Sequence, residues 1–264
     1  MLKKIKHVFQ YGHIWWQYYL AHKEILRPAI IHNMINMLSC GTSSRGHARY
    51  DCPNPDCTHT KRVLFTCKSR SCPSSGKKAT YQWSAKQQAI LPATKWQHIV
   101  MTMPKELWRL FQLNRHLLND LSPLAASCIQ TLAKNQHLAP GIFTALHTFG
   151  RDLKWNVHVH LSTTCGGLTT NGNWQQLYYK KQTLMRMWRY SVVDLLREAH
   201  KNGRLKLPRS LQHYCPTHIA INAWLDRRYQ NAGYCIMPNP RTIIPIPSII
   251  WGVTLSDPRY HNPD

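Results

Sequence analysis

The residues with the clearest capacity for chemistry are four cysteines in two closely spaced pairs. Cys52 and Cys57 are separated by four residues, nine residues follow, and Cys67 and Cys72 form a second pair with the same separation. Thiolates are strong ligands of zinc, and two such pairs joined by a short hairpin can converge on one tetrahedral ion. The spacing therefore predicts a zinc site on these four residues; the alternative is four reduced cysteines that bind no metal.

A second group of potential ligands is His158-Val159-His160, which lies within an apolar segment typical of a β-strand. Side chains at positions i and i+2 of a strand project from the same face, so both imidazoles can hold one divalent ion. In nucleic-acid chemistry such an ion would polarise the scissile phosphate. The alternative is a chance pair of structural histidines, because the chain contains 16 histidines.

The cysteines lie in a segment that differs from the sequence before it. Residues 1–39 are expected to be helical, with the aromatic stretch 15–20 in the core and DNA stacking as the weaker interpretation of it. A second helix should begin at Pro28 and end before Gly41. The zinc-binding module, assigned to 40–95, has little hydrophobic periodicity, so it needs a metal to hold it together.

The histidines lie in a segment with alternating strands and helices, assigned to 96–230. The pattern predicts strands at 97–104, 142–149 and 157–164, helices within 105–136, and a long helix at 182–202. This order predicts an α+β fold, in which a small metal module precedes a core with a central antiparallel sheet flanked by helices. The remaining residues, 231–264, are rich in proline and follow neither the helix nor the strand period.

The charge of the chain is strongly unbalanced. It contains 34 Lys and Arg but 11 Asp and Glu, which gives a formal net charge of +23 and a pI of about 10.0. A polyanion is the partner that such a surface fits best, so we expect DNA binding. The basic residues nearest to the two ligand groups are the expected DNA contacts: Lys68, Arg70, Lys77, Lys78, Arg151 and Lys154.

The same composition argues against other classes of protein. No run approaches roughly 18 uninterrupted apolar residues, so no membrane-spanning helix is expected. The basic N-terminus is followed by polar and aromatic residues rather than by the apolar centre of a signal peptide, which favours a cytoplasmic protein.

In combination, these motifs resemble the insertion-sequence-91 family of transposases, which serve rolling-circle elements of bacteria. Three stretches carry the resemblance: the cysteine module from His47 to Pro73, the strand 98–104 with its Thr-Met-Pro ending, and the segment from Leu146 to His160. The last is similar to the family's His-hydrophobic-His (HUH) motif, and together the stretches cover roughly residues 10–230.

The resemblance implies a specific chemistry. In the family, Mg or Mn lies on the two HUH histidines and a third ligand, for which His98 and His147 are the candidates here. A tyrosine hydroxyl attacks a phosphate of single-stranded DNA and forms a 5′-phosphotyrosine, which nicks and transfers the strand. The zinc module would help to recognise the transposon end.

The cysteine module departs from the family pattern at one position. The family's module ends in Cys-Pro-x-Cys, whereas this chain reads Cys72-Pro73-Ser74-Ser75, so that Ser75 stands in place of the last cysteine. Cys40, His47 and His59 are the residues nearby that could replace the missing ligand.

The second departure concerns the nucleophile. The family carries Tyr-x3-Tyr, but no such pair follows Arg228, and Tyr229 and Tyr234 are separated by four residues. When the last base of each codon is read with the first two bases of the next, the codons of 249–258 permit Tyr-Leu-Gly-Arg-Tyr. In that frame Trp251 and Gly252 can only yield a glycine codon, and the degeneracy of the other codons allows the remaining residues. We therefore expect that a frameshift replaced the C-terminus, and that this copy binds DNA without a nucleophile of its own.

Two alternatives are also compatible with the sequence. The first is a replication initiator or relaxase that nicks DNA with a remaining tyrosine such as Tyr190 or Tyr229. The second is a non-enzymatic zinc-containing protein that binds nucleic acid, including RNA. The oligomeric state and the target sequence do not follow from the residues.

Overall fold

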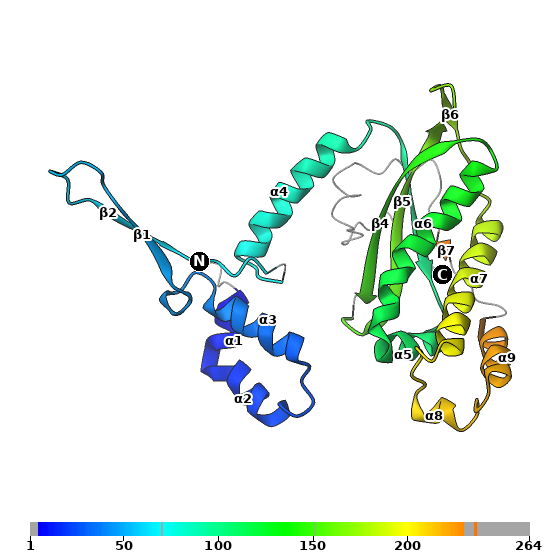
Figure 1. Cartoon of the computed structure of the whole chain (residues 1–264), viewed down its shortest axis with the longest axis horizontal. Coiled ribbons are helices and arrows are strands. Elements are labelled where there is room, and N and C mark those ends of the chain that lie inside the picture. The colour runs from blue at the N-terminus through cyan, green and yellow to red at the C-terminus, as the bar shows by residue number, and fades with distance from the viewer. Residues whose placement is uncertain (1–4, 70, 151, 230–234, 237–264) are drawn as a thin grey trace. The chain divides into compact units, whose positions relative to one another are not determined.

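The computed structural model describes residues 5–69, 71–150, 152–229 and 235–236 (Figure 1). Its internal contacts divide the chain into two compact units, residues 1–89 and 90–264. The N-terminal helices and the cysteine module thus belong to one unit, and the segment with the histidines forms the other.

The first unit contains short helices and one hairpin. In chain order its elements are α1 (Ile5–Gln10), η1 (Tyr11–His13), α2 (Ile14–His22), α3 (Pro28–Ser39), η2 (Ser43–Arg45), β1 (His47–Asp51), β2 (Thr60–Leu64) and α4 (Ser75–Ile90). Pro28 occupies the first turn of α3, where its missing N–H costs nothing. Gly41 follows that helix with a φ of +67°, a left-handed conformation that suits glycine.

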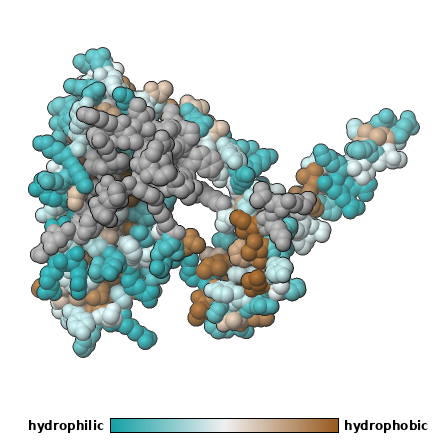
Figure 2. Space-filling view, turned by 180° about the vertical axis from the view of Figure 1, so that it is seen from behind, coloured by the Kyte–Doolittle hydropathy of each residue, from teal (hydrophilic) through white to brown (hydrophobic). Residues whose placement is uncertain are grey.

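The aromatic residues of α2 are less buried than their sequence suggests. Trp15 is buried, but Trp16 and Tyr18 are 47% and 50% exposed, and Leu20 is also exposed. Figure 2 shows hydrophobic residues gathered on the surface of these N-terminal helices. The expectation of a core position holds for Trp15 and is wrong for the other three, because α2 is apolar on all sides while only one side finds a packing partner.

The hairpin of β1 and β2 determines where the cysteines lie. The two strands are antiparallel, with His47 opposite Leu64 at one end and Asp51 opposite Thr60 at the other. Cys52 and Cys57 therefore lie in the loop that closes the hairpin, whereas Cys67 follows β2 at its open end. Most hairpin side chains are exposed, which agrees with the expectation of a segment without its own core.

The second unit is a sheet with helices. Its elements are β3 (Trp96–Thr102), α5 (Lys105–Leu113), η3 (Arg115–Leu117), α6 (Leu118–Lys134), β4 (Ala139–Phe149), β5 (Trp155–Leu168), β6 (Trp174–Gln176), α7 (Lys181–Lys201), α8 (Arg209–Gln212), α9 (His218–Tyr229) and β7 (Cys235–Ile236). The strand order is β4-β5-β3-β7, with β6 on β5, and all pairs are antiparallel. This arrangement confirms the predicted α+β fold with an antiparallel sheet.

The hydrophobic core lies on one face of this sheet. Ile99 and Met101 of β3 and Val157, Val159 and Leu161 of β5 are fully buried and form one cluster with residues of α5, α6, α7 and α9. Helices α6 and α7 are seen beside the sheet in Figure 1. Because side chains alternate along a strand, the residues between these positions project from the opposite face. The histidines of β3 and β5 are among them.

Trp188 joins the longest helix, α7, to the sheet. Its side chain is fully buried, and its indole Nε1 donates a hydrogen bond of 2.7 Å to the backbone carbonyl of Thr102 at the end of β3. The apolar stripe predicted for this helix, of which Leu184, Val192 and Leu196 are also fully buried, faces the same core.

We predict that Trp188→Ala lowers the free energy of unfolding by about 3–5 kcal/mol, because it removes a large buried side chain and leaves a cavity. Trp188→Phe should lower the free energy of unfolding by less, because it keeps much of the buried volume even though it loses the hydrogen bond. Tyr190→Ala on the exposed side of the same helix is the control and should change the free energy by less than about 0.5 kcal/mol. Chemical denaturation followed by circular dichroism measures all three. Equal stability of the two alanine variants would contradict the packing described.

Candidate metal centres

The pairing of β4 with β5 brings three histidines together. His147 of β4 lies directly opposite His158 of β5, and His160 projects from the same face of β5 as His158. One ring nitrogen from each of these histidines lies within 4.8 Å of the other two. The rings of His147 and His160 are close as well, with centroids 4.2 Å apart. Three imidazoles thus converge on one point at the sheet surface.

Hydrogen bonds indicate which nitrogen of the two β5 histidines is free for a ligand. The Nδ1 atom of His158 donates to the backbone carbonyl of Asn156 at 3.1 Å. The Nδ1 atom of His160 lies 2.9 Å from Nε2 of His98. In both rings the Nε2 atom remains for a ligand, which is the usual arrangement of metal-binding histidines.

The two candidates for a third ligand occupy different positions. His147 belongs to the converging group, whereas His98 lies on β3 behind His160. Both nitrogens of His98 have protein partners, since its Nδ1 atom is 3.2 Å from the hydroxyl of Ser162. The geometry therefore favours His147 over His98 as the third metal ligand.

Burial keeps these rings in the neutral state that binds metals. It lowers the pKa of His160 to about 2, with further contributions from the neighbouring His147, His98 and His158. Burial and the proximity of His147 lower the pKa of His98 to about 4. The pKa values of His147 and His158 are lowered as well, again mainly by burial. Within the described part of the chain, no carboxylate belongs to this group of ligands.

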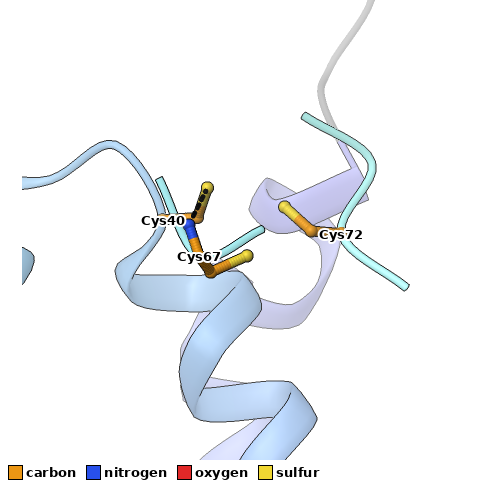
Figure 3. A group of neighbouring side chains, drawn as sticks. All are labelled: Cys40, Cys67 and Cys72. Carbon is orange, nitrogen blue, oxygen red and sulfur yellow. Dashed lines mark hydrogen bonds between the residues drawn. The ribbon is translucent and has the colours of Figure 1, made fainter. Parts of the chain in front are cut away.

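A second group of potential ligands consists of Cys40, Cys67 and Cys72. Their sulfur atoms lie within 4.8 Å of one another (Figure 3). Cys40 follows α3, Cys67 follows β2 and Cys72 precedes α4, so the group joins three elements of the first unit. The backbone N–H of Cys67 donates to the Cys40 sulfur at 3.3 Å. Cys40 and Cys72 are buried, as expected for the centre of a small folded module.

Ser75 stands at a fourth corner of this group. Its hydroxyl oxygen is 3.3 Å from the sulfur of Cys67 and 3.6 Å from the sulfur of Cys40. Burial alone would raise the pKa of Cys72, but hydrogen bonds from the Ser75 hydroxyl and from the backbone of Ser75 and Ser74 outweigh it and lower the pKa to about 6. Three thiolates are a ligand set that zinc favours, and a hydroxyl at the fourth corner is a weaker donor than a thiolate.

The cysteine group differs from the four-cysteine site expected from the sequence. Cys67 and Cys72 are part of it, but Cys52 and Cys57 are not, because β1 and β2 separate the hairpin loop from the open end of the hairpin. Cys40, one of the three residues named as possible replacement ligands, lies in the group instead. The backbone at His59 and then the Cys52 thiol form hydrogen bonds that lower the pKa of Cys57, so this pair has its own local environment. Neither His47 nor His59 belongs to a group of three ligands among the described residues.

The expected DNA contacts are surface residues where the structure describes them. Lys68, Lys77, Lys78 and Lys154 are exposed. Arg70 and Arg151 lie outside the described residues. The ammonium group of Lys154 forms an exposed ion pair of 3.0 Å with Asp152, which offsets part of its charge.

The two tyrosines named as possible nucleophiles differ in their exposure. Tyr229 is fully buried, and its hydroxyl donates a hydrogen bond of 3.4 Å to the carbonyl of Thr102. Tyr190 is exposed on α7, and the opposite side of that helix packs in the core. Tyr234 and the segment 249–258 lie outside the described residues.

A hollow next to His158 has no signal in the sequence. It has a volume of about 410 Å³ and is lined by Thr102, Met103, Lys105, Trp108 and Asn156, among others. Two of its lining residues are neighbours of His158 in the fold: Thr102 pairs with it across the sheet, and the Asn156 carbonyl accepts its hydrogen bond. Its lining residues come from two stretches of the chain, residues 102–108 and Asn156, and only the folded sheet brings them together.

None of the helices in the described part of the chain combines the length and the apolar character that a membrane span requires.

The segments that contain the two ligand groups both match known protein families. Residues 12–103, with the three cysteines and His98, match the family described as "Transposase zinc-binding domain". Residues 141–242, with the other three histidines, match the family described as "Putative transposase". The second match continues past residue 230, the boundary at which the composition changes. No solved structure matches the chain.

Two curated relatives are similar to the chain over much of its length. The transposase for insertion sequence element IS801 from Pseudomonas savastanoi pv. phaseolicola is 43% identical over 211 residues, which are 80% of this chain and 51% of that protein. The protein y4qJ of Sinorhizobium fredii, also described as a transposase, is 28% identical over 176 residues, 63% of this chain and 44% of its own length. The chain thus spans about half the length of these relatives. The two family matches and these relatives show that the chain belongs to the insertion-sequence-91-like transposases.

Proposed function

We propose that this chain binds the DNA of a transposon end and holds a divalent ion on His147, His158 and His160, next to a phosphate of one DNA strand. The observation that carries the proposal is the convergence of three imidazoles on one face of the sheet. The IS801 relative is named as a transposase, which supports DNA as the partner. The surplus of positive charge supports the same partner.

The ligands also bear on the identity of the ion. Mg²⁺ prefers oxygen ligands, whereas imidazole suits transition metals, and no carboxylate belongs to this group among the described residues. We therefore favour Mn²⁺ over Mg²⁺. When bound, such an ion polarises a phosphate oxygen and offsets the charge that develops on it. The carbonyl of Asn156 orients the ring of His158 for this purpose.

We also propose that zinc lies on Cys40, Cys67 and Cys72, with Ser75 at the fourth position. This site would link the end of α3, the open end of the hairpin and the start of α4, a segment with little core of its own. A zinc ion there supplies folding free energy that the sparse apolar contacts do not. The exposed Lys77 and Lys78, in the first turn of α4, would then be held in a fixed position for DNA.

For the zinc site we predict that Cys40→Ala releases the ion, whereas Cys52→Ala keeps it, because only the first of these cysteines belongs to the group with Cys67 and Cys72. Ser75→Cys should bind zinc more tightly than the natural chain, since a thiolate is a stronger zinc ligand than a hydroxyl. Competition with a coloured chelator measures the affinities. Retention of zinc by Cys40→Ala together with its loss from Cys52→Ala would contradict this ligand set.

For DNA we predict binding to single strands that weakens as salt rises, with a slope of log affinity against log salt of about 0.7 for each neutralised phosphate. Replacing Lys77 and Lys78 by alanine should weaken binding to all sequences and lower that slope by roughly 1.4. Filter binding or fluorescence anisotropy at several salt concentrations measures both. Parallel titrations with duplex DNA and RNA test the alternative of an RNA-binding protein, which tighter binding to RNA would favour.

We infer further that this copy lacks its own nucleophile. In-line attack requires a hydroxyl next to the phosphate. Tyr229 is fully buried and hydrogen-bonded to the backbone, and Tyr190 is exposed on α7. The expected nucleophile segment belongs to 231–264, where the shifted frame would have removed it.

We therefore predict that the purified chain forms no covalent adduct with transposon-end DNA. Restoring the frame, so that Tyr-Leu-Gly-Arg-Tyr is encoded, should produce nicking that His158→Ala or His160→Ala abolishes. Denaturing gels with end-labelled DNA show the adduct. An adduct formed by the unrepaired chain and lost in Tyr190→Phe or Tyr229→Phe would instead support the relaxase alternative.

A further inference from the structure

We propose that His98 is a positioning residue: held between Ser162 and His160, it fixes the ring of His160 so that Nε2 points to the metal. This inference rests on the metal site proposed above. It assigns to His98 a role distinct from that of a ligand.

The contacts of His98 form a chain of three side chains on one face of the sheet. In the pairing of β3 with β5, His98 lies opposite Ser162, two residues beyond His160. Its Nδ1 atom is 3.2 Å from the Ser162 hydroxyl, and its Nε2 atom is 2.9 Å from Nδ1 of His160. The three side chains are 8%, 3% and 6% exposed for His98, Ser162 and His160. Water therefore has little access to take the place of any of these partners.

Only one direction of these hydrogen bonds is compatible with a metal on His160. If Nε2 of His160 binds the ion, its Nδ1 atom carries the ring proton and donates to His98. His98 must then accept at Nε2, so its own proton lies on Nδ1 and is donated to the oxygen of Ser162. In the reverse direction the His160 proton would lie on Nε2 and block the ligand position.

Ser162 is part of the proposal because a histidine such as His98 can either accept a hydrogen bond from His160 or donate one to it. The partner of His158 is a backbone carbonyl, which can only accept and so fixes that ring by itself. An imidazole nitrogen can accept or donate, so His98 accepts from His160 only when its own proton lies on Nδ1. The Ser162 hydroxyl can also do either, and in the proposed arrangement its oxygen accepts that proton. The ring nitrogen of a metal-binding histidine that does not bind the metal usually donates to a carboxylate, a carbonyl or water. Here a neutral imidazole takes that place and adds no negative charge near the DNA phosphate.

The test compares His98→Phe with His98→Gln in the full-length, zinc-loaded chain. Phenylalanine keeps a ring but removes the acceptor, so affinity for Mn²⁺ should fall by about 10–100-fold, as for the loss of other outer partners. Glutamine can accept from His160 through its carbonyl and donate to Ser162 through its amide, so affinity should stay near that of the natural chain. His116→Phe, at an exposed histidine in η3, is the matched control. Electron paramagnetic resonance of free Mn²⁺ gives the affinities, and circular dichroism checks the fold.

A second measurement needs no metal and no activity. Nitrogen-15 NMR of the histidine rings should show the His160 proton on Nδ1 in the natural chain and in His98→Gln. In Ser162→Ala, a small change, the proton should be shared between the two nitrogens, and Mn²⁺ affinity should fall several-fold. A proton that stays on Nδ1 in Ser162→Ala, or unchanged Mn²⁺ affinity in His98→Phe while His160→Ala loses binding, would overturn the positioning role alone. Unchanged binding in His160→Ala would overturn the metal site as well.

Discussion

The register between β4 and β5 is the constraint on which the histidine site depends. One face of β5 is set by Val157, Val159 and Leu161, which are fully buried against the helices. A slip of one residue would turn these side chains out of the core and the histidines into it, so hydrophobic packing fixes the face on which the histidines lie. The same register places His147 opposite His158, and an irregularity between His147 and Phe149 ends the regular pairing just beyond it. The packing of the helices on one face of the sheet thus determines the position of the histidines on the other face.

The first unit has far fewer buried hydrophobic residues than the second. Its hairpin is largely exposed, and its small buried cluster is made of Met37, Cys40 and Cys72. The cysteines are therefore both the core and the candidate ligands, which explains why a metal suits this segment. In the proposed zinc site, Ser75 takes the fourth position with a weaker donor than a thiolate. The exposed aromatic residues of α2 show the same shortage of packing partners within the unit.

Several features could be predicted from the sequence because they depend on local patterns. The strand with His158 and His160, the long helix around Trp188 and the helix that begins at Pro28 follow from periodicity and from proline geometry. Cys40 could be named as a possible ligand, but the separation of Cys52 and Cys57 from the group could not be predicted, because it depends on which end of the hairpin each cysteine reaches. The different positions of His147 and His98 likewise depend on the strand order. The hollow could not be predicted either, because residues 102–108 and Asn156 are distant in the sequence. The aromatic residues of α2 are less buried than the sequence predicts, because a hydrophobic segment is buried only where another element packs against it.

The central claim is that His147, His158 and His160 form one metal site. Crystals of the full chain grown with Mn²⁺, measured on both sides of the manganese absorption edge, test it most directly. The proposed geometry predicts one anomalous peak bound by one nitrogen of each of these three histidines, with Nε2 as the ligand of His158 and His160 and with His98 outside the coordination sphere. A peak bound by His98, or no peak at this face of the sheet while Mn²⁺ is bound elsewhere, would contradict it.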